Sequence, residues 1–315
     1  MIRHQFKTQD LVTLNAVETG NPSGQAILFV HGLSQSWRSW MRQFADPRLR
    51  ERFRLVALDL RGHGESQGAI GAIDQEGKPL ASLCDAQYND GNVETTSYSW
   101  AYDLDAAIEA LHLDRPLLIG WSAGAWVIQS YFLAHSGLGA IGKAILYASV
   151  PVLLPPGTQD GGSHLSVRPE TIDAILRTYP VNPTFEPPSS NDDRTVAMGL
   201  IDFINLCFAD ETDRAVNSAS IQGTMAFNLL TPPQVRLLLG TRWFDARPLL
   251  AGLSDAERER IMALTPQGDR IFYAEVSNTY WAAARIRNLQ VQREGHCYHV
   301  RSADEFNKHV LAFAS

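Results

Sequence analysis

The chain has 315 residues, of which 45% are hydrophobic and 19% charged, and its formal net charge at pH 7 is −7. These fractions are ordinary for a folded protein, and the length suits one large α/β domain or two smaller ones. A net negative charge provides no cationic field, so we expect no nucleic acid and no membrane as partners. The chain also lacks an apolar run of the ~20 residues that a membrane span needs and a secretory signal, which predicts a soluble cytoplasmic protein.

Three cysteines, Cys84, Cys207 and Cys297, lie far apart and lack the spacing of metal ligands. An odd number of scattered cysteines is typical of free thiols in a reducing compartment. We therefore expect no metal site and no other cofactor. The sequence leaves open whether the protein works as a monomer or as a homodimer.

Short apolar runs alternate with helical patterns along most of the chain. Residues 12–17 suit an edge strand, and further strands are predicted at 26–30, 54–58, 117–119, 143–148, 261–265 and 289–293. Helices are predicted at 100–113, 125–133, 195–208, 233–239, 273–286 and 303–313. Alternation of this kind predicts an α/β protein with a mainly parallel sheet and helices on both faces.

Two segments interrupt this alternation. Residues 67–97 are polar and glycine-rich, and we expect an inserted loop with room for a short hairpin. Residues 151–244 are rich in proline and glycine at first and then helical. Open α/β sheets bind ligands at the carboxyl ends of their strands, so we expect this second insertion to form a cap, or lid, over that edge. The predicted organisation is a core of residues 1–150 and 245–315 with a cap of residues 151–244.

The most informative stretch is Gly120-Trp121-Ser122-Ala123-Gly124, which joins a predicted strand to a predicted helix. Its Gly-x-Ser-x-Gly pattern is called the nucleophile elbow, and we refer to these five residues as the elbow. A turn this tight leaves no room for side chains at the two glycines and lifts the serine hydroxyl above the end of the sheet. There the backbone N–H groups and the dipole of the helix favour negative charge. The alternative is a serine that only caps the helix. The strand before and the helix after favour a catalytic nucleophile.

A serine hydroxyl is a weak nucleophile and needs an adjacent base. The histidines that follow Ser122 are His135, His164, His296, His299 and His309. His296 follows a predicted strand and a glycine, which places it on a loop at the same edge of the sheet as Ser122. His299 is the second candidate, and a histidine with a purely structural role is the alternative.

The carboxylate that would orient this histidine has two candidates. If residues 261–265 form the strand, Asp269 lies in the turn after it, 27 residues before His296, which is room for one helix and one strand. The rival interpretation begins a helix at Ser254, because Ser254 and Glu257 form a capping box. The strand then becomes residues 270–276, and Glu275 is the carboxylate near its end. We favour Asp269.

Taken together, these residues resemble the α/β-hydrolase superfamily over nearly the whole chain. The matching motifs are residues 31–33 (HGL), 59–66 (DLRGHGES), 120–124 (GWSAG), 268–271 (GDRI) and 295–296 (GH). The resemblance implies an α/β-hydrolase fold with Ser122 as nucleophile, His296 as base and Asp269 as orienting acid. It also implies an oxyanion hole made by the backbone N–H groups of Leu33 and Ala123. Dehalogenase and epoxide-hydrolase members carry aspartate at the elbow, so Ser122 argues against both activities.

The leading hypothesis is a serine hydrolase that cleaves a small-molecule ester, lactone or thioester through an acyl-enzyme intermediate. A carbon–carbon bond hydrolase or cofactor-free oxygenase on the same fold is the second, and a ligand-binding receptor that retains the triad is the third. Trp37 and Trp121 are close to the motifs in sequence and are predicted to line the substrate pocket. Trp126 is expected to pack in the core instead.

Overall fold

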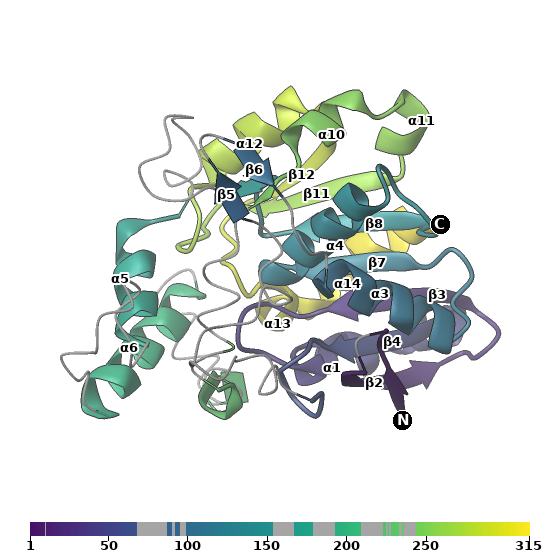
Figure 1. Ribbon diagram of the computed structural model, residues 1–315, viewed down its shortest axis with the longest axis horizontal. Helices are drawn as coiled ribbons and strands as arrows, with labels where there is room; N and C mark the ends of the chain where they lie inside the picture. Colours follow the sequence, from purple (N-terminus) through teal and green to yellow (C-terminus); the bar gives the residue numbers. More distant parts are fainter. Residues whose placement is uncertain are drawn as a thin grey trace.

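The structure is a computed structural model. It describes residues 1–9, 11–67, 87–89, 92–94, 99–153, 167–178, 193–208, 223–224, 226, 228–232, 235 and 244–315. Its centre is an eight-stranded sheet in the order β1-β2-β4-β3-β7-β8-β11-β12 (Figure 1). The strands are β1 (Ile2–Lys7), β2 (Thr13–Gly20), β3 (Gln25–Val30), β4 (Phe53–Asp59), β7 (Leu117–Trp121), β8 (Lys143–Tyr147), β11 (Ile261–Pro266) and β12 (Arg287–Val291).

The sheet is mainly parallel, as predicted. Strands β4, β3, β7, β8, β11 and β12 pair in parallel, whereas β2 runs antiparallel to both of its neighbours. The prediction that residues 12–17 form an edge strand is wrong, because β2 lies between β1 and β4. The edge on this side is β1, which the sequence reasoning missed.

Helices cover both faces of the sheet. Helices α3 (Ser99–Ala110) and α4 (Ala123–Ala134) lie together on one face, and α14 (Ala303–Ala314) lies on the other (Figure 1). The shorter η1 (Trp37–Trp40), α1 (Met41–Phe44), α2 (Pro47–Arg52) and α13 (Tyr298–Arg301) lie on the side of α14, while α12 (Ala274–Ala283) packs on β11 and β12. Two short helices, α10 (Arg247–Gly252) and α11 (Asp255–Arg258), precede β11. Within the described part of the chain, no helix combines the length and apolarity needed to cross a membrane.

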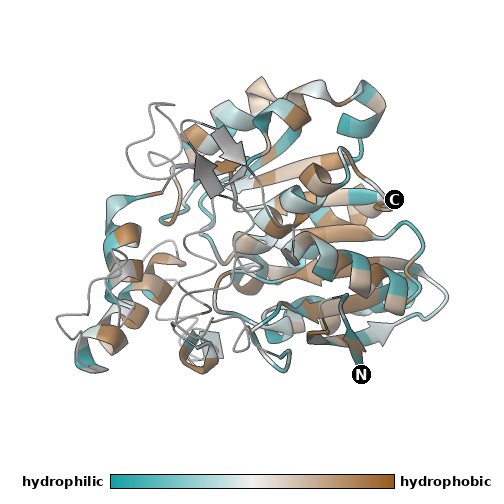
Figure 2. Ribbon diagram, viewed as in Figure 1, coloured by the Kyte–Doolittle hydropathy of each residue, from teal (hydrophilic) through white to brown (hydrophobic). Residues whose placement is uncertain are grey.

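The core is built from the central parallel strands. Every residue of β7 and β11 is buried, and Met262 and Leu264 are each 1% exposed. Strands with helices on both faces have no solvent side, so their sequences are continuous apolar runs. Figure 2 shows this directly, with hydrophobic residues along the middle strands and hydrophilic residues on the outer faces of the helices. Trp126 belongs to the same core, as predicted.

The 151–244 segment begins and ends on a short ribbon outside the main sheet. Strand β9 (Val152–Leu153) pairs antiparallel with β10 (Phe244–Asp245). Between them lie α5 (Pro169–Arg177) and α6 (Asp193–Leu206), joined by the ion pair of Arg177 with Asp202 at 2.9 Å. The predicted helix at 195–208 is confirmed by α6. The one predicted at 233–239 falls mostly outside the described residues.

The same segment contacts the loops that follow several strands of the sheet. Gln35, in the loop after β3, donates from Nε2 to the carbonyl oxygen of Thr224 at 3.4 Å. Arg168 N donates to Ile271 O at 3.0 Å, after β11, and Cys297 N donates to Cys207 O at 2.9 Å, after β12. Because these loops follow carboxyl ends of parallel strands, the described residues Arg168, Cys207 and Thr224 of the insertion contact that edge of the sheet. Cys207 and Cys297 are both buried free thiols, and Cys84 lies outside the described residues.

The polar segment at 67–97 contains the hairpin for which the sequence left room. Strands β5 (Gln87–Asn89) and β6 (Asn92–Glu94) pair antiparallel in a sheet of their own. Apart from residue 67 and these strands, the segment lies outside the described residues.

Candidate active site

The turn between β7 and α4 holds Ser122 in a conformation that side chains rarely adopt. Its backbone angles are φ 53° and ψ −118°, a strained region for any residue with a Cβ. A Cβ on Gly120 would lie 2.6 Å from Ala125 N, and one on Gly124 would lie 2.3 Å from Val30 O. Both glycines are therefore required by close backbone contacts, as the sequence predicted.

Ser122 does not cap the helix that it precedes. Its side chain makes no capping hydrogen bond to α4, which excludes the helix-capping alternative. The Ser122 residue is 8% exposed, and its backbone N–H donates to the carbonyl oxygen of Tyr147 at 2.9 Å. The elbow is thus fixed by its backbone and leaves the hydroxyl uncommitted to the fold.

His296 and Asp269 form a buried pair after β12 and β11. His296 Nδ1 donates to Asp269 Oδ2 at 2.8 Å, and each side chain is 2% exposed. The other carboxylate oxygen, Oδ1, accepts from Ile271 N at 2.7 Å and from Phe272 N at 3.2 Å. An ionised carboxylate only accepts hydrogen bonds, so this arrangement places the imidazole proton on Nδ1 and leaves the Nε2 lone pair free.

Of the two carboxylate candidates, the structure brings Asp269 to the histidine. The strand is β11 (Ile261–Pro266), as the Asp269 interpretation requires, whereas Glu275 lies exposed in the first turn of α12. The capping box of the rival interpretation does exist, with the Ser254 side chain accepting from Glu257 N. Helix α11 nevertheless ends at Arg258, which leaves room for the strand directly after it.

The second histidine candidate occupies a buried, structural position. His299 is fully buried in α13, and its ring lies 4.7 Å from that of Trp40 and 4.5 Å from that of Trp121, centroid to centroid. Burial lowers the pKa of His299 to about 3, so its ring is neutral at physiological pH. His299 is therefore part of the packing behind the site.

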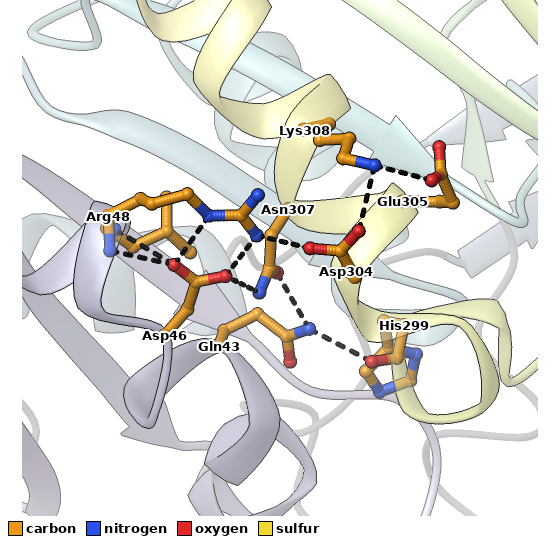
Figure 3. A network of polar contacts seen from close by, with 9 residues as sticks. Gln43, Asp46, Arg48, His299, Asp304, Glu305, Asn307 and Lys308 are labelled. Atoms are coloured by element: carbon orange, nitrogen blue, oxygen red, sulfur yellow. Dashed lines mark hydrogen bonds and ion pairs between the residues drawn. The ribbon is translucent and has the colours of Figure 1, made fainter.

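A polar network supports the helix that carries His299 (Figure 3). Gln43 Nε2 donates to the His299 carbonyl oxygen at 2.9 Å and to Asn307 Oδ1 at 3.1 Å. Asn307 Nδ2 in turn donates to Asp46 Oδ2 at 2.8 Å. The network joins the α1–α2 region to α13 and α14 and so anchors the chain just after His296.

The two backbone groups expected to form an oxyanion hole have no competing partners. Among the described residues, neither Leu33 N nor Ala123 N donates a hydrogen bond to another protein group. Ala123 is the first residue of α4, where N–H groups lack intrahelical acceptors. The adjoining Gly32 packs against the elbow, since a Cβ there would lie 3.4 Å from Ser122 Cβ. Both donors thus belong to segments in contact at Ser122.

His31 fixes the loop that carries Leu33. Leu60 N donates to His31 Nε2 at 3.0 Å, so Nδ1 holds the proton and donates to Gly32 O at 2.8 Å. Burial lowers the pKa of His31 well below its usual value, and it lowers the pKa of the neighbouring His63 to about 4. Both rings are neutral parts of the scaffold.

These buried neutral histidines predict acid lability. In the unfolded chain, histidines have a pKa near 6.5 and bind protons below that pH. Native His31, His63 and His299 stay unprotonated there, so the free energy of unfolding falls as pH falls. Between pH 6.5 and its native pKa, each of these histidines lowers the free energy of unfolding by about 1.4 kcal/mol for every unit by which the pH falls. Urea unfolding at pH 7.5, 6.0 and 5.0 measures the loss. A free energy of unfolding that stays constant over this range would contradict the prediction.

The two tryptophans predicted to line the pocket are both buried. Trp37 packs against Phe44, lies under the Arg38 guanidinium at 4.9 Å, and donates its backbone N–H to Asp59 at 2.7 Å. Trp121 packs against the rings of His296 and His299. Trp121 also borders a cavity of about 150 Å³, whose lining includes Gln35, Thr224 and Val300. A substrate-binding role for either tryptophan stays a prediction.

Cavity size alone does not locate the site. A larger cavity of about 640 Å³ lies among Gln25, Arg54, Lys143 and their neighbours. These residues stand at the amino ends of β3, β4 and β8, on the opposite edge from Ser122. In the described ranges, no three His, Cys, Asp or Glu side chains are grouped so as to hold a metal ion.

Sequence reasoning missed one residue of this site, Tyr147. It ends β8, beside the elbow, and its hydroxyl donates to the carbonyl oxygen of His296 at 2.5 Å. The available signal was its position, a hydroxyl-bearing side chain at the carboxyl end of a predicted buried strand. No hydrogen bond joins Ser122 Oγ to His296 among the described residues; such contacts often tighten only when substrate binds.

The sequence profile of the alpha/beta hydrolase family matches residues 27–309. The chain belongs to this family. It is 25% identical over 176 residues to the AB hydrolase superfamily protein YisY of Bacillus subtilis (strain 168), a match that covers 56% of this chain and 55% of YisY. The chain thus spans about half the length of this curated relative. The family shares the fold described above.

Two solved structures resemble the chain over almost its full length. A proposed aryl esterase from Burkholderia cenocepacia is 27% identical, with a TM-score of 0.73 and coverage of 99% of this chain and 98% of that one. The esterase RhEst1 from Rhodococcus sp. ECU1013 is 23% identical, with the same TM-score and the same coverages. The second likeness shows the fold alone.

Proposed function

We propose that this family member is a serine hydrolase that cleaves a small-molecule carboxylic ester, lactone or thioester through an acyl-enzyme intermediate. The observation that carries the proposal is the buried His296–Asp269 pair, joined at 2.8 Å, at the same sheet edge as the strained Ser122. The likeness to a proposed aryl esterase at 27% identity supports the same class of substrate.

The chemistry follows from the roles of the three side chains. Ser122 Oγ attacks the acyl carbon while His296 Nε2 takes its proton, and Asp269 holds the imidazole tautomer and stabilises the imidazolium. The N–H groups of Leu33 and Ala123 stabilise the oxyanion, and one such donor is worth about 3 kcal/mol. His296 then protonates the leaving alcohol or thiol. Water, deprotonated by the same nitrogen, then attacks the acyl carbon, and His296 returns that proton to Ser122 Oγ as the acyl–Oγ bond breaks and the acid leaves.

We further propose that the 151–244 segment is a cap that selects the acyl chain. Thr224 borders the 150 Å³ cavity beside Trp121, so Thr224→Phe should shrink it. We expect the ratio of kcat/KM between a long and a short acyl ester to change by about tenfold or more. Leu229→Phe is the matched control, because Leu229 belongs to the same segment but is 60% exposed. If Thr224→Phe changes the kcat/KM ratio no more than Leu229→Phe does, the acyl pocket lies elsewhere.

A panel of p-nitrophenyl esters, lactones, thioesters, amides and a diketone, with oxygen uptake followed by electrode, tests the proposed activity. We expect turnover of at least one ester, lactone or thioester by the wild-type chain and none above background by Ser122→Ala. Turnover confined to a diketone would point to carbon–carbon bond hydrolysis, and oxygen consumption would point to a cofactor-free oxygenase. Binding without turnover on the whole panel would favour a receptor.

A further inference from the structure

The carbonyl oxygen of His296 accepts hydrogen bonds from two buried side chains. Tyr147 donates from its hydroxyl at 2.5 Å, and Trp121 donates from Nε1 at 3.0 Å. A carbonyl oxygen has two lone pairs, so these donors use its full capacity. The backbone of His296 is therefore held from two directions, independently of the bond from its ring to Asp269.

Both donors also belong to the nucleophile side of the site. Trp121 directly precedes Ser122 in the chain. Tyr147 accepts the Ser122 backbone N–H at its own carbonyl oxygen, at 2.9 Å. One residue thus binds the backbone of Ser122 with its main chain and the backbone of His296 with its side chain.

Both donors are shielded from solvent. Tyr147 is fully buried and Trp121 is 4% exposed. Burial raises the pKa of Tyr147 well above its usual value, so its hydroxyl keeps its proton and donates at every pH at which the enzyme would work. The His296 ring packs against the rings of Trp121 and Phe272, at centroid distances of 5.6 and 5.7 Å, which limits movement of the imidazole.

We infer that Trp121 and Tyr147 are positioning residues that set the distance between Ser122 and the base His296. The inference rests on the proposed function. Asp269 fixes the rotation and tautomer of the imidazole, whereas the two donors fix where the imidazole stands relative to the elbow. This assigns Trp121 a role different from the pocket wall expected from the sequence.

Tyr147→Phe and Trp121→Phe test the inference on the best ester of the panel. Each removes one donor and keeps an aromatic ring. Since small misplacements of reacting groups cost up to about 10²-fold, we expect each to lower kcat by about tenfold, with KM changed by less than about twofold. The double variant should lose more than the product of the single losses, because either donor alone retains part of the hold on the same carbonyl.

Matched controls separate positioning from ordinary loss of packing. Tyr131→Phe removes a buried hydroxyl that accepts from Ala140 N at 3.1 Å, away from the site. Trp281→Phe shrinks a fully buried tryptophan whose Nε1 has no hydrogen-bond partner among the described residues. We expect both controls to lower the melting temperature as much as the test variants but to keep kcat within about twofold of wild type.

The outcomes distinguish the inference from the proposed function. If the wild-type chain turns over esters and the test variants match their controls in kcat, the positioning role is wrong and the proposed function stands. A loss that appears in KM rather than kcat, or single losses that simply multiply, would also overturn it. If the wild-type chain shows neither ester turnover nor labelling of Ser122 by a fluorophosphonate, the proposed function fails and the inference fails with it.

Discussion

Ser122→Ala is expected to lower kcat for ester hydrolysis by on the order of 10⁶, because it removes the hydroxyl oxygen that we propose forms the acyl-enzyme. The remaining rate should reflect substrate binding and the oxyanion donors. Steady-state assays on purified variants, with the wild type at the same concentration, measure the loss. Turnover by Ser122→Ala within tenfold of wild type would remove this serine from the mechanism.

A second substitution at the same position checks that this loss is chemical. Ser122→Gly also lacks the hydroxyl, but glycine adopts φ 53° without strain. Strained backbone of this kind costs on the order of 1–3 kcal/mol. We therefore expect Ser122→Gly to be as inactive as Ser122→Ala and to have a higher melting temperature than the wild-type chain. Loss of activity in a variant with an elevated melting temperature cannot be explained by unfolding.

Asp269→Asn is expected to lower kcat by about 10⁴-fold. An amide in place of the carboxylate can turn its NH₂ group toward His296 Nδ1, which favours the wrong imidazole tautomer and leaves the imidazolium unstabilised. The Oδ1 contacts to Ile271 N and Phe272 N can be kept by the amide oxygen, so the fold should be retained. Steady-state kinetics with circular dichroism as a check of folding measure the effect.

Glu275→Gln is the matched control for this prediction. It makes the same chemical change six residues away, at an exposed position in the first turn of α12. We expect less than a twofold effect on kcat, because nothing in the described structure links Glu275 to His296. An inactive Glu275→Gln beside an active Asp269→Asn would reverse the assignment of the orienting acid.

Much of the candidate site could be predicted because its residues lie next to glycines and at the ends of apolar runs, which are recognisable in the sequence. The glycines of the elbow leave a visible spacing, and His296 follows a glycine after a strand. The fold was equally readable, since the buried parallel strands are continuous apolar runs. Strand β1 was missed for the opposite reason, because five of its six residues alternate between exposed and partly exposed positions and none is buried. An edge strand without a buried face has no hydrophobic pattern.

The register near β11 was ambiguous in the sequence for a physical reason. The capping box at Ser254 is real, and local capping energy correctly predicts where a helix begins but not how long it continues. Helix α11 stops at Arg258, and that side chain turns back to donate to the carbonyl oxygen of Ala251 at 2.6 Å. Only the pairing of β11 with β8 and β12 settles the strand.

The positions of the aromatic side chains near the site depend on tertiary contacts that the sequence does not reveal. Proximity in sequence suggested Trp37 and Trp121 as pocket walls. Both are buried, and Trp121 borders the 150 Å³ cavity while its Nε1 donates to the backbone of His296. Tyr147 gave no motif at all. Its importance arises because β7 and β8 are neighbours in the sheet, so the end of one strand lies beside the elbow that follows the other.

The most direct test of the proposed mechanism is covalent trapping of the nucleophile in the wild-type chain. Incubation with a fluorophosphonate, followed by peptide mass spectrometry, should give one adduct per chain, on the peptide containing Ser122, at a rate that matches the loss of esterase activity. An adduct on Ser34 or Ser66 instead, or full ester turnover after Ser122 has been completely labelled, would contradict the assignment of Ser122 as the nucleophile.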